Sequence, residues 1–267
     1  MEMDDLIGLT LIAVFGIGAQ WLAWRLRLPS ILFLLFAGFG AGFMGWVDPD
    51  GLFGDLLFPV VSMSVGLIMF EGGLSLKFRD LKSIGGTLLA LITIAPIVTW
   101  GLTTLLAIYL LGLSWEVAVL LGAILVVTGP TVIIPLLRQV RPKGQVASLL
   151  KWEGILIDPV GATLALLVFE VISMEDTTHA ATDVVLIIAK TLLIGLILGG
   201  FGGWFLLQMF RRYWIPDYLQ NPVTLMLVLA VFALSNTMQH ESGLLSVTVM
   251  GIVLANQRQA HTHHIVE

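Results

Sequence analysis

Long continuous apolar stretches follow one another along the chain, and they constrain its fold more than any other feature. Most reach about 17 residues, the length that an α-helix needs to cross the hydrocarbon core of a bilayer. The stretches are 6–24, 30–46, 57–74, 86–111, 115–137, 146–170, 184–209, 222–239 and 243–256. The connections between them are short, so no soluble domain is inserted. The sequence therefore predicts an all-α polytopic membrane protein of about nine transmembrane helices.

The composition argues against several other classes of protein. Apolar residues make up 58 % of the 267 residues and charged residues only 12 %. Soluble domains carry about 25 % charged residues, so we expect neither a disordered chain nor a soluble domain. The chain contains no cysteine, which rules out a disulfide scaffold, a thiol nucleophile and a cysteine metal site.

The positive charges alternate with the stretches. Twelve of the 13 Lys and Arg residues follow an odd-numbered stretch or lie in the first turns of the next one, namely Arg25, Arg27, Lys77, Arg79, Lys82, Arg138, Arg141, Lys143, Lys151, Arg211, Arg212 and Arg258. Cationic residues collect on the cytoplasmic side of a membrane. We therefore expect the N-terminus outside and the C-terminus in the cytoplasm. The exception, Lys190, either snorkels to the interface or pairs with a buried carboxylate.

Apart from Glu116, at the outer start of the stretch 115–137, four carboxylates fall within the apolar stretches: Glu71, Glu153, Asp158 and Glu170. A charge at the bilayer centre costs about 2.5–3.5 kcal/mol or more, so such residues are functional candidates. Glu170 ends its stretch at the outer interface, where we expect it to be solvated. Glu71 and Glu153 lie at similar inner depths, and Asp158 lies at the midpoint of its stretch.

Asp158 and Glu153 cannot share one ligand shell in an ideal helix. Five residues turn the helix by about 500°, so the two side chains point about 140° apart. Pro159 supplies a cause for local distortion, because it removes a backbone donor and crowds the preceding turn.

A break is expected within the stretch 115–137. Thr128-Gly129-Pro130 should unwind a helix there, and unwound backbone in a membrane is tolerated where it lines a cavity or is buried in protein. Its freed carbonyl groups become ligands for ions. Oxygen ligands and carboxylates at one depth suit a hard monovalent cation or protons. The alternative is a pair of kinked helices with hydrogen-bonded carboxylic acids.

Several motifs together resemble the monovalent cation:proton antiporter family, specifically the NhaP-like sodium/proton exchangers. They are Leu28-Pro29 with Gly38 and Gly42, Leu67-Ile68-Met69-Phe70-Glu71-Gly72-Gly73-Leu74, Thr128-Gly129-Pro130, Glu153-Gly154-Ile155-Leu156-Ile157-Asp158, and Ser242-Gly243-Leu244-Leu245 with Gly251 and Asn256. The resemblance spans about residues 6–256. It departs from the family where Gly129 replaces an aspartate, Gly154 a serine and Ile157 an asparagine, which leaves potassium as plausible a substrate as sodium.

The resemblance implies a secondary antiporter that exchanges Na⁺ or K⁺ for H⁺, not an enzyme, with no cofactor and no nucleic-acid partner. Asp158 would bind proton and cation alternately, with Glu71 as a further ligand of the monovalent cation. Thr128 and Gly129 would contribute at the helix break. Glu153, Pro130 and Pro159 would organise the site. The expected setting is a homodimer in the lipid bilayer of a bacterial plasma (inner) membrane.

The resemblance also implies one transmembrane exchanger domain over residues 1–267. Its N-terminal repeat would cover about 6–170, a linker helix 184–209, and the start of a second repeat 222–256. The segments Leu28–Gly38 and Glu241–Gly251 echo each other weakly, and they begin spans of opposite direction, as inverted repeats do. Only two helices of a second repeat are seen, so we expect a partial chain; a complete short protein is the alternative.

Other functions stay open at this point. A non-transporting membrane module, such as a sensor or an assembly subunit, could keep the same fold, and a cation channel is a third possibility. The histidines His261, His263 and His264 are expected in a solvated cytoplasmic segment, with metal binding or pH sensing as the alternative.

Overall fold

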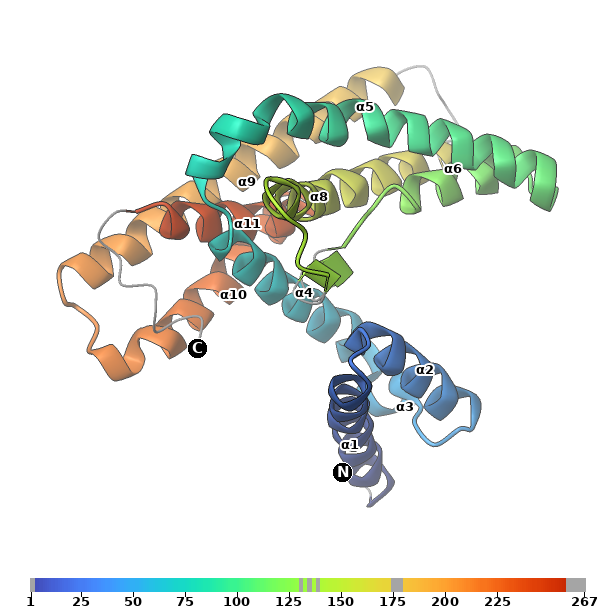
Figure 1. Cartoon of the computed structure of the whole chain (residues 1–267), viewed down its shortest axis with the longest axis horizontal. Coiled ribbons are helices and arrows are strands. Elements are labelled where there is room, and N and C mark those ends of the chain that lie inside the picture. The colour runs from blue at the N-terminus through green and yellow to red at the C-terminus, as the bar shows by residue number, and fades with distance from the viewer. Residues whose placement is uncertain (1–2, 130–131, 134–135, 138–139, 174–179, 258–267) are drawn as a thin grey trace. The chain divides into compact units, whose positions relative to one another are not determined.

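The computed structural model describes residues 3–129, 132–133, 136–137, 140–173 and 180–257. In this part of the chain the regular elements are helical, and no strand occurs (Figure 1). The elements are α1 (Met3–Leu26), α2 (Ser30–Phe43), α3 (Pro49–Phe53), the 3₁₀-helix η1 (Gly54–Leu56), α4 (Leu57–Leu74), α5 (Phe78–Leu111), α6 (Trp115–Ile124), α8 (Val146–Ser173), α9 (Ala180–Arg211), the 3₁₀-helix η2 (Asp217–Leu219), α10 (Gln220–Met238) and α11 (Ser242–Ala255).

Each of the nine predicted stretches contains a helix in the described part of the chain, so the all-α prediction is confirmed. Six segments are long and apolar enough to cross a membrane, and α2, α6 and α11 are shorter apolar helices. Two bounds differ from expectation. α5 begins at Phe78 instead of residue 86, and α6 ends at Ile124, well before residue 137.

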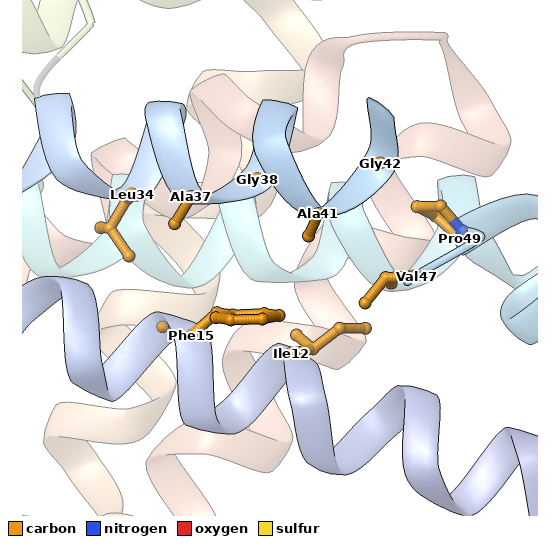
Figure 2. Close-up of a pocket in the computed structure, with 10 residues that line it drawn as sticks. Ile12, Phe15, Leu34, Ala37, Gly38, Ala41, Gly42, Val47 and Pro49 are labelled. Atoms are coloured by element: carbon orange, nitrogen blue, oxygen red, sulfur yellow. The ribbon is translucent and has the colours of Figure 1, made fainter. Parts of the chain in front are cut away.

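The chain divides into two compact units. The first comprises residues 1–64 and 131–142, and α1 packs against α2 and α3 within it. Phe15 stacks on Trp46 with ring centroids 5.9 Å apart. An apolar cavity of about 320 Å³ lies between α1 and α2, lined by residues that include Ile12, Leu34 and Gly38 (Figure 2).

The second unit comprises residues 65–130 and 143–267. α5, α6 and α8 pack against one another, and α11 packs against α8, α9 and α10 (Figure 1). One buried apolar cluster joins the C-terminal half of α4 to α9, α10 and α11, with Phe70, Leu206, Phe232 and Met250 among its members. This unit holds the described carboxylates of interest.

Glycines let three helices of the second unit approach closely. A Cβ atom on Gly73 of α4 would lie 2.5 Å from the carbonyl oxygen of Thr248 on α11, and one on Gly251 would collide with the carbonyl oxygen of Phe70. On α9, Gly199 meets the carbonyl oxygen of Ser246 in the same way. Small residues are the usual means of close packing between membrane helices.

Asn256 fastens the end of α11 to the turn between α4 and α5. Its Oδ1 accepts a hydrogen bond from the N–H of Phe78 at 2.6 Å, and its Nδ2 donates to the carbonyl oxygen of Leu76 at 2.9 Å. Phe78 also stacks on Trp152 near the start of α8, with ring centroids 6.2 Å apart. The end of α11, the turn between α4 and α5, and the start of α8 are thereby held together.

Candidate functional site

α8 carries two of the carboxylates that we predicted to form the site. Glu153 and Asp158 are both half-buried, and the buried Pro159 follows Asp158 directly. Proline has no N–H, so the carbonyl oxygen of Ile155 lacks its usual partner one turn later. α8 nevertheless continues through Pro159 to Ser173.

The predicted helix break is present after α6. Leu125 and Val126 form a turn, and Thr128 and Gly129 lie outside any helix. The hydroxyl of Thr128 donates a hydrogen bond to Oε1 of Glu153 at 2.7 Å. The break is therefore tied to α8 through one of the predicted carboxylates. Pro130, which we expected to shape the break, lies outside the described residues.

The segment containing the break makes a second contact with α8. A Cβ atom on Gly161 would overlap the side chain of Val127, so the absence of a side chain at Gly161 lets this segment lie against the helix. Glu153 and Gly161 are eight residues apart, which is about 12 Å along a helix. Asp158 lies between these two points of contact.

Asp158 lies on the side of α8 that packs against α4 and α11. Three residues before it, Ile155 contacts the backbone of α4 at Gly72. Four residues after it, Ala162 packs against the cluster that includes Leu244 of α11. Residues at these spacings share one face of a helix, so Asp158 lies between the unwound segment and the α4–α11 pair.

Glu71 lies apart from the other carboxylates in this structure. Its side chain is exposed, whereas the neighbouring Gly72 and Gly73 are buried against α8 and α11. Among the described residues, no hydrogen bond or ion pair joins Glu71 to Asp158. Its role as a second cation ligand stays a prediction.

The remaining sequence candidates can be placed as well. Glu170 is half-buried near the C-terminal end of α8, and Lys190 is exposed on α9. Within the described ranges, no three Asp, Glu or His side chains form a group that could hold a metal ion. His261, His263 and His264 lie outside those ranges.

One acidic residue near the site was missed by the sequence analysis. Glu241 is half-buried at the N-cap position of α11, one of the helices that pack against α8. The sequence pattern marks it only as one end of a weak repeat. The one sign in the sequence that could have pointed to Glu241 is its position immediately before the Ser242-Gly243 motif.

Comparisons with known proteins identify the family. A family model described as "Sodium/hydrogen exchanger, transmembrane" matches residues 9–267. The chain belongs to this sodium/hydrogen exchanger family. The resemblance that we drew from the motifs is thus confirmed, and the chain is a multi-pass membrane protein.

Relatives in this exchanger family have names that describe cation/proton antiport. The chain is 26 % identical over 264 residues to the K(+)/H(+) antiporter NhaP2 of Shewanella baltica. The matched region covers 98 % of this chain and 45 % of that protein. It is 25 % identical over 260 residues to the Na(+)/H(+) antiporter 1 of Methanocaldococcus jannaschii, covering 96 % and 61 % of the two chains. The chain spans about half the length of the curated relatives it matches.

A solved exchanger structure has the same fold. The sodium proton antiporter MjNhaP1 from Methanocaldococcus jannaschii, determined at pH 8, superposes with a TM-score of 0.75 at 20 % identity. The match covers 95 % of this chain and 63 % of that one. The exchanger fold is therefore established for the described part of this chain.

Proposed function

We propose that this protein exchanges Na⁺ or K⁺ for H⁺ across a membrane, with the carboxylate of Asp158 as the group that carries them in turn. The observation that carries the proposal is the position of the unwound segment. It contacts α8 at Glu153 and at Gly161, and Asp158 lies between these contacts. The names of the relatives, which include both K⁺/H⁺ and Na⁺/H⁺ antiporters, support the same reaction class.

Competition at one carboxylate explains the coupling. A carboxylic acid that loses its proton to water becomes an anion that attracts a cation, and entry of the cation disfavours the return of the proton. One negative charge therefore leaves the site occupied by either H⁺ or the metal ion. Exposure of the site to the two sides in turn would convert this competition into exchange.

The other predicted residues would assist Asp158. Glu153 would hold the break in place by accepting the hydrogen bond of Thr128. The backbone oxygens of Thr128 and Gly129 would act as cation ligands, because they lie outside the helical hydrogen-bond ladder. Pro159 would leave the carbonyl oxygen of Ile155 free on the same helix face. Glu71 would be a further ligand that approaches Asp158 when the cation binds.

The assembly and orientation are also proposed. The N-terminus would lie outside and the C-terminus in the cytoplasm of a bacterial plasma membrane, on the basis of the charge pattern. The protein would act as a homodimer embedded in the bilayer, as one exchanger domain with an N-terminal repeat at about 6–170, a linker helix at 184–209 and a second repeat that begins at 222–256.

Asp158→Asn tests the proposal. The substitution keeps the shape of the side chain but removes the charge, and an amide does not exchange a proton for a cation in the physiological pH range. Vesicles that carry the full chain with this substitution should show no dissipation of an imposed proton gradient when NaCl or KCl is added, at unchanged protein abundance. Exchange at the wild-type rate would refute the mechanism.

Two other functions give different results in the same assay. A non-transporting module would move no monovalent cation in its wild-type form over a broad pH range. A cation channel would pass current without moving protons in the opposite direction, and Asp158→Asn would change its conductance without affecting any proton gradient.

A further inference from the structure

The apolar cavity of the first unit is elongated along α2. Its lining on that helix runs from Leu34 to Gly42, which is eight residues or about 12 Å along the axis. α1 contributes Ile12, Phe15 and Gly16 to the opposite wall, and Figure 2 shows the side chains of Ile12 and Phe15 lying between the two helices. The hydrocarbon of one membrane leaflet is about 15 Å deep, half of a bilayer core. The cavity therefore has nearly the length of a single leaflet.

The volume of the cavity calls for an occupant. An engineered apolar cavity of about 150 Å³ in a soluble protein already takes up benzene, and this cavity measures about 320 Å³. Its wall is formed by aliphatic and aromatic side chains and by glycine, so water would find few hydrogen-bond partners there. An empty space of this size would deprive the lining atoms of their dispersion contacts. We therefore expect an apolar molecule in it.

The cavity is open to its surroundings along one side. Ile12, Gly38 and Gly42 line it and are nevertheless exposed. The segment Leu6–Leu26, which contains Ile12, is long and apolar enough to cross a membrane. The apolar molecules that surround such a helix are the acyl chains of lipids, and an acyl chain has the elongated form that the cavity requires.

The end of the cavity nearest the loop after α2 has the features of a membrane interface. Val47 and Pro49 line this end (Figure 2), and Asp48 lies between them in the sequence. Trp46, whose ring stacks on Phe15, is exposed beside them, and tryptophan is enriched where a membrane meets water. The carboxylate of Asp48 is exposed and makes no capping hydrogen bond to α3. Its charge is therefore available to a lipid headgroup.

The charge of the first unit is separated between its two sides. The exposed acidic residues after α2 are Asp48, Asp50 and Asp55. The basic residues among the described part of this unit are Arg25, Arg27 and Arg141, all of which follow odd-numbered stretches. By the charge pattern the acidic residues lie on the outer side and the basic residues on the inner side. The acidic end of the cavity should attract a headgroup with a positive charge and repel an anionic one.

We propose that this cavity binds one acyl chain of an outer-leaflet phospholipid whose headgroup carries an ammonium group, with the ammonium beside Asp48. The acyl chain fills the space between α1 and α2 and stabilises the first unit. The inference does not depend on the cation that the protein moves. It uses the charge pattern only to assign the leaflet.

Gly38→Leu tests the acyl-chain site. The full chain is stripped of lipid in digitonin, whose rigid ring system offers no flexible chain, and dioleoyl phosphatidylethanolamine is then added. The lipid should raise the melting temperature of the wild type, and the half-saturating lipid concentration should rise about tenfold or more in Gly38→Leu, because leucine occupies the cavity. Gly40→Leu is the matched control. Gly40 has the same open space for a Cβ atom on the same helix but does not line the cavity, so its response should stay within about twofold of the wild type.

The same two variants show that a lost response does not come from misfolding. Both substitutions replace a helical glycine and so gain helix propensity, but only Gly38→Leu also fills a cavity. Without added lipid, Gly38→Leu should therefore melt about 2–5 °C above the wild type and above Gly40→Leu. A phosphatidylethanolamine with a diazirine near the end of its acyl chain locates the bound lipid directly. In the wild type it should cross-link to α1 or α2, close to Gly16 or Leu34.

Asp48→Asn tests the headgroup. The wild type should bind dioleoyl phosphatidylethanolamine about three- to tenfold more tightly than dioleoyl phosphatidylglycerol, the scale of a few screened charges. Asp48→Asn should reduce this preference to about twofold or less, because asparagine is an equally good N-cap without the charge. Asp48→Glu should retain the preference. Equal preferences in the wild type and Asp48→Asn would overturn the assignment of the headgroup.

The remaining results decide the site as a whole. An equal lipid response in the wild type and Gly38→Leu, or cross-links confined to helices other than α1 and α2, would overturn it. A wild type without a lipid response, together with a changed oligomeric state in Gly38→Leu, would assign the cavity to a contact between two copies of the chain instead. None of these results bears on the exchange that we propose for Asp158, which the vesicle assay tests separately.

Discussion

At the scale of single residues, the contact between Thr128 and Glu153 is the most specific link of the candidate site. Thr128→Val removes the hydroxyl and keeps the branched shape, so Glu153 loses its one hydrogen bond within the described residues. A hydrogen bond to a charged group contributes about 1.5–3 kcal/mol, and less where the bond is exposed, as this one is. We expect the half-saturating cation concentration in the exchange assay to rise about two- to tenfold.

Thr128→Ser is the control for that substitution, because serine keeps the hydroxyl and should exchange nearly as the wild type does. An equal defect in the serine and valine variants would show that the hydrogen bond to Glu153 does not hold the site.

Glu71→Gln tests whether Glu71 only binds the cation or also carries the proton, as we propose for Asp158. Glu71 is exposed and makes no hydrogen bond or ion pair in the described part of the chain, so its loss should not disturb folding. As a ligand it should lower the apparent cation affinity, while the maximal exchange rate is kept. Titration of vesicles with NaCl and KCl measures both quantities. A loss of exchange as complete as that of Asp158→Asn would assign Glu71 an equal share in carrying the proton.

Residue patterns predicted the candidates on α8 but not their contacts. Charges in apolar stretches are rare enough to single out Glu153 and Asp158 from the sequence alone. The bond between Thr128 and Glu153 joins residues 25 positions apart, and no spacing rule connects them. Glu241 was overlooked because it lies in a turn, where an acidic residue is ordinarily solvated.

At the scale of helices, hydropathy predicted the number of elements better than their ends. α5 begins at Phe78, because the charged residues Arg79, Asp80 and Lys82 interrupt the apolar run without interrupting the helix. Helices tolerate charges at a membrane interface, where side chains reach water. α6 ends at Ile124 although apolar residues follow. Hydropathy does not show such an end, because non-helical backbone is tolerated within a membrane where it is buried in protein or lines a cavity.

Glycine clusters with the same appearance have different roles in different helices. A Cβ atom added at Gly38, Gly40 or Gly42 on α2 would meet nothing within 4 Å, and two of these glycines line the cavity of Figure 2 instead. The cluster on α9 includes Gly199, which touches the backbone of α11, and Gly200, which faces open space. Sequence alone could not distinguish these cases, because the partner helix is not encoded locally.

This difference predicts opposite effects for two adjacent substitutions. Gly199→Ala should push α9 from α11 and lower the melting temperature in detergent, because backbone atoms of Ser246 cannot move aside. The cost should be about 1–3 kcal/mol, as for other overpacked positions. Gly200→Ala should be neutral or stabilise the protein by up to about 1 kcal/mol through helix propensity. Equal melting temperatures for the two variants would contradict the close contact between α9 and α11.

At the scale of the whole molecule, the apolar stretches and the positive charges independently predict the same order of membrane crossings. The apolar stretches predicted the helices that the structure contains, and the positive charges alternate in step with them. A wrong number of spans would scramble this alternation. The three short helices α2, α6 and α11 would be doubtful spans by length alone, so the charge pattern is the stronger argument that each of them crosses.

The chain offers a clean test of this orientation because it contains no cysteine. Single substitutions Lys143→Cys and Glu116→Cys place one thiol at each end of the segment that includes α6. Lys143 belongs to the positive group after the fifth stretch, and Glu116 to the acidic residues of the opposite side.

With the N-terminus outside, a membrane-impermeant maleimide added to intact cells should label Glu116→Cys. It should label Lys143→Cys only after the membrane is opened, since positive loops stay in the cytoplasm. The cysteine-free wild type controls for background. Labelling of both thiols from the same side would mean that the short segment around α6 does not cross the membrane, and the proposed orientation would then be wrong.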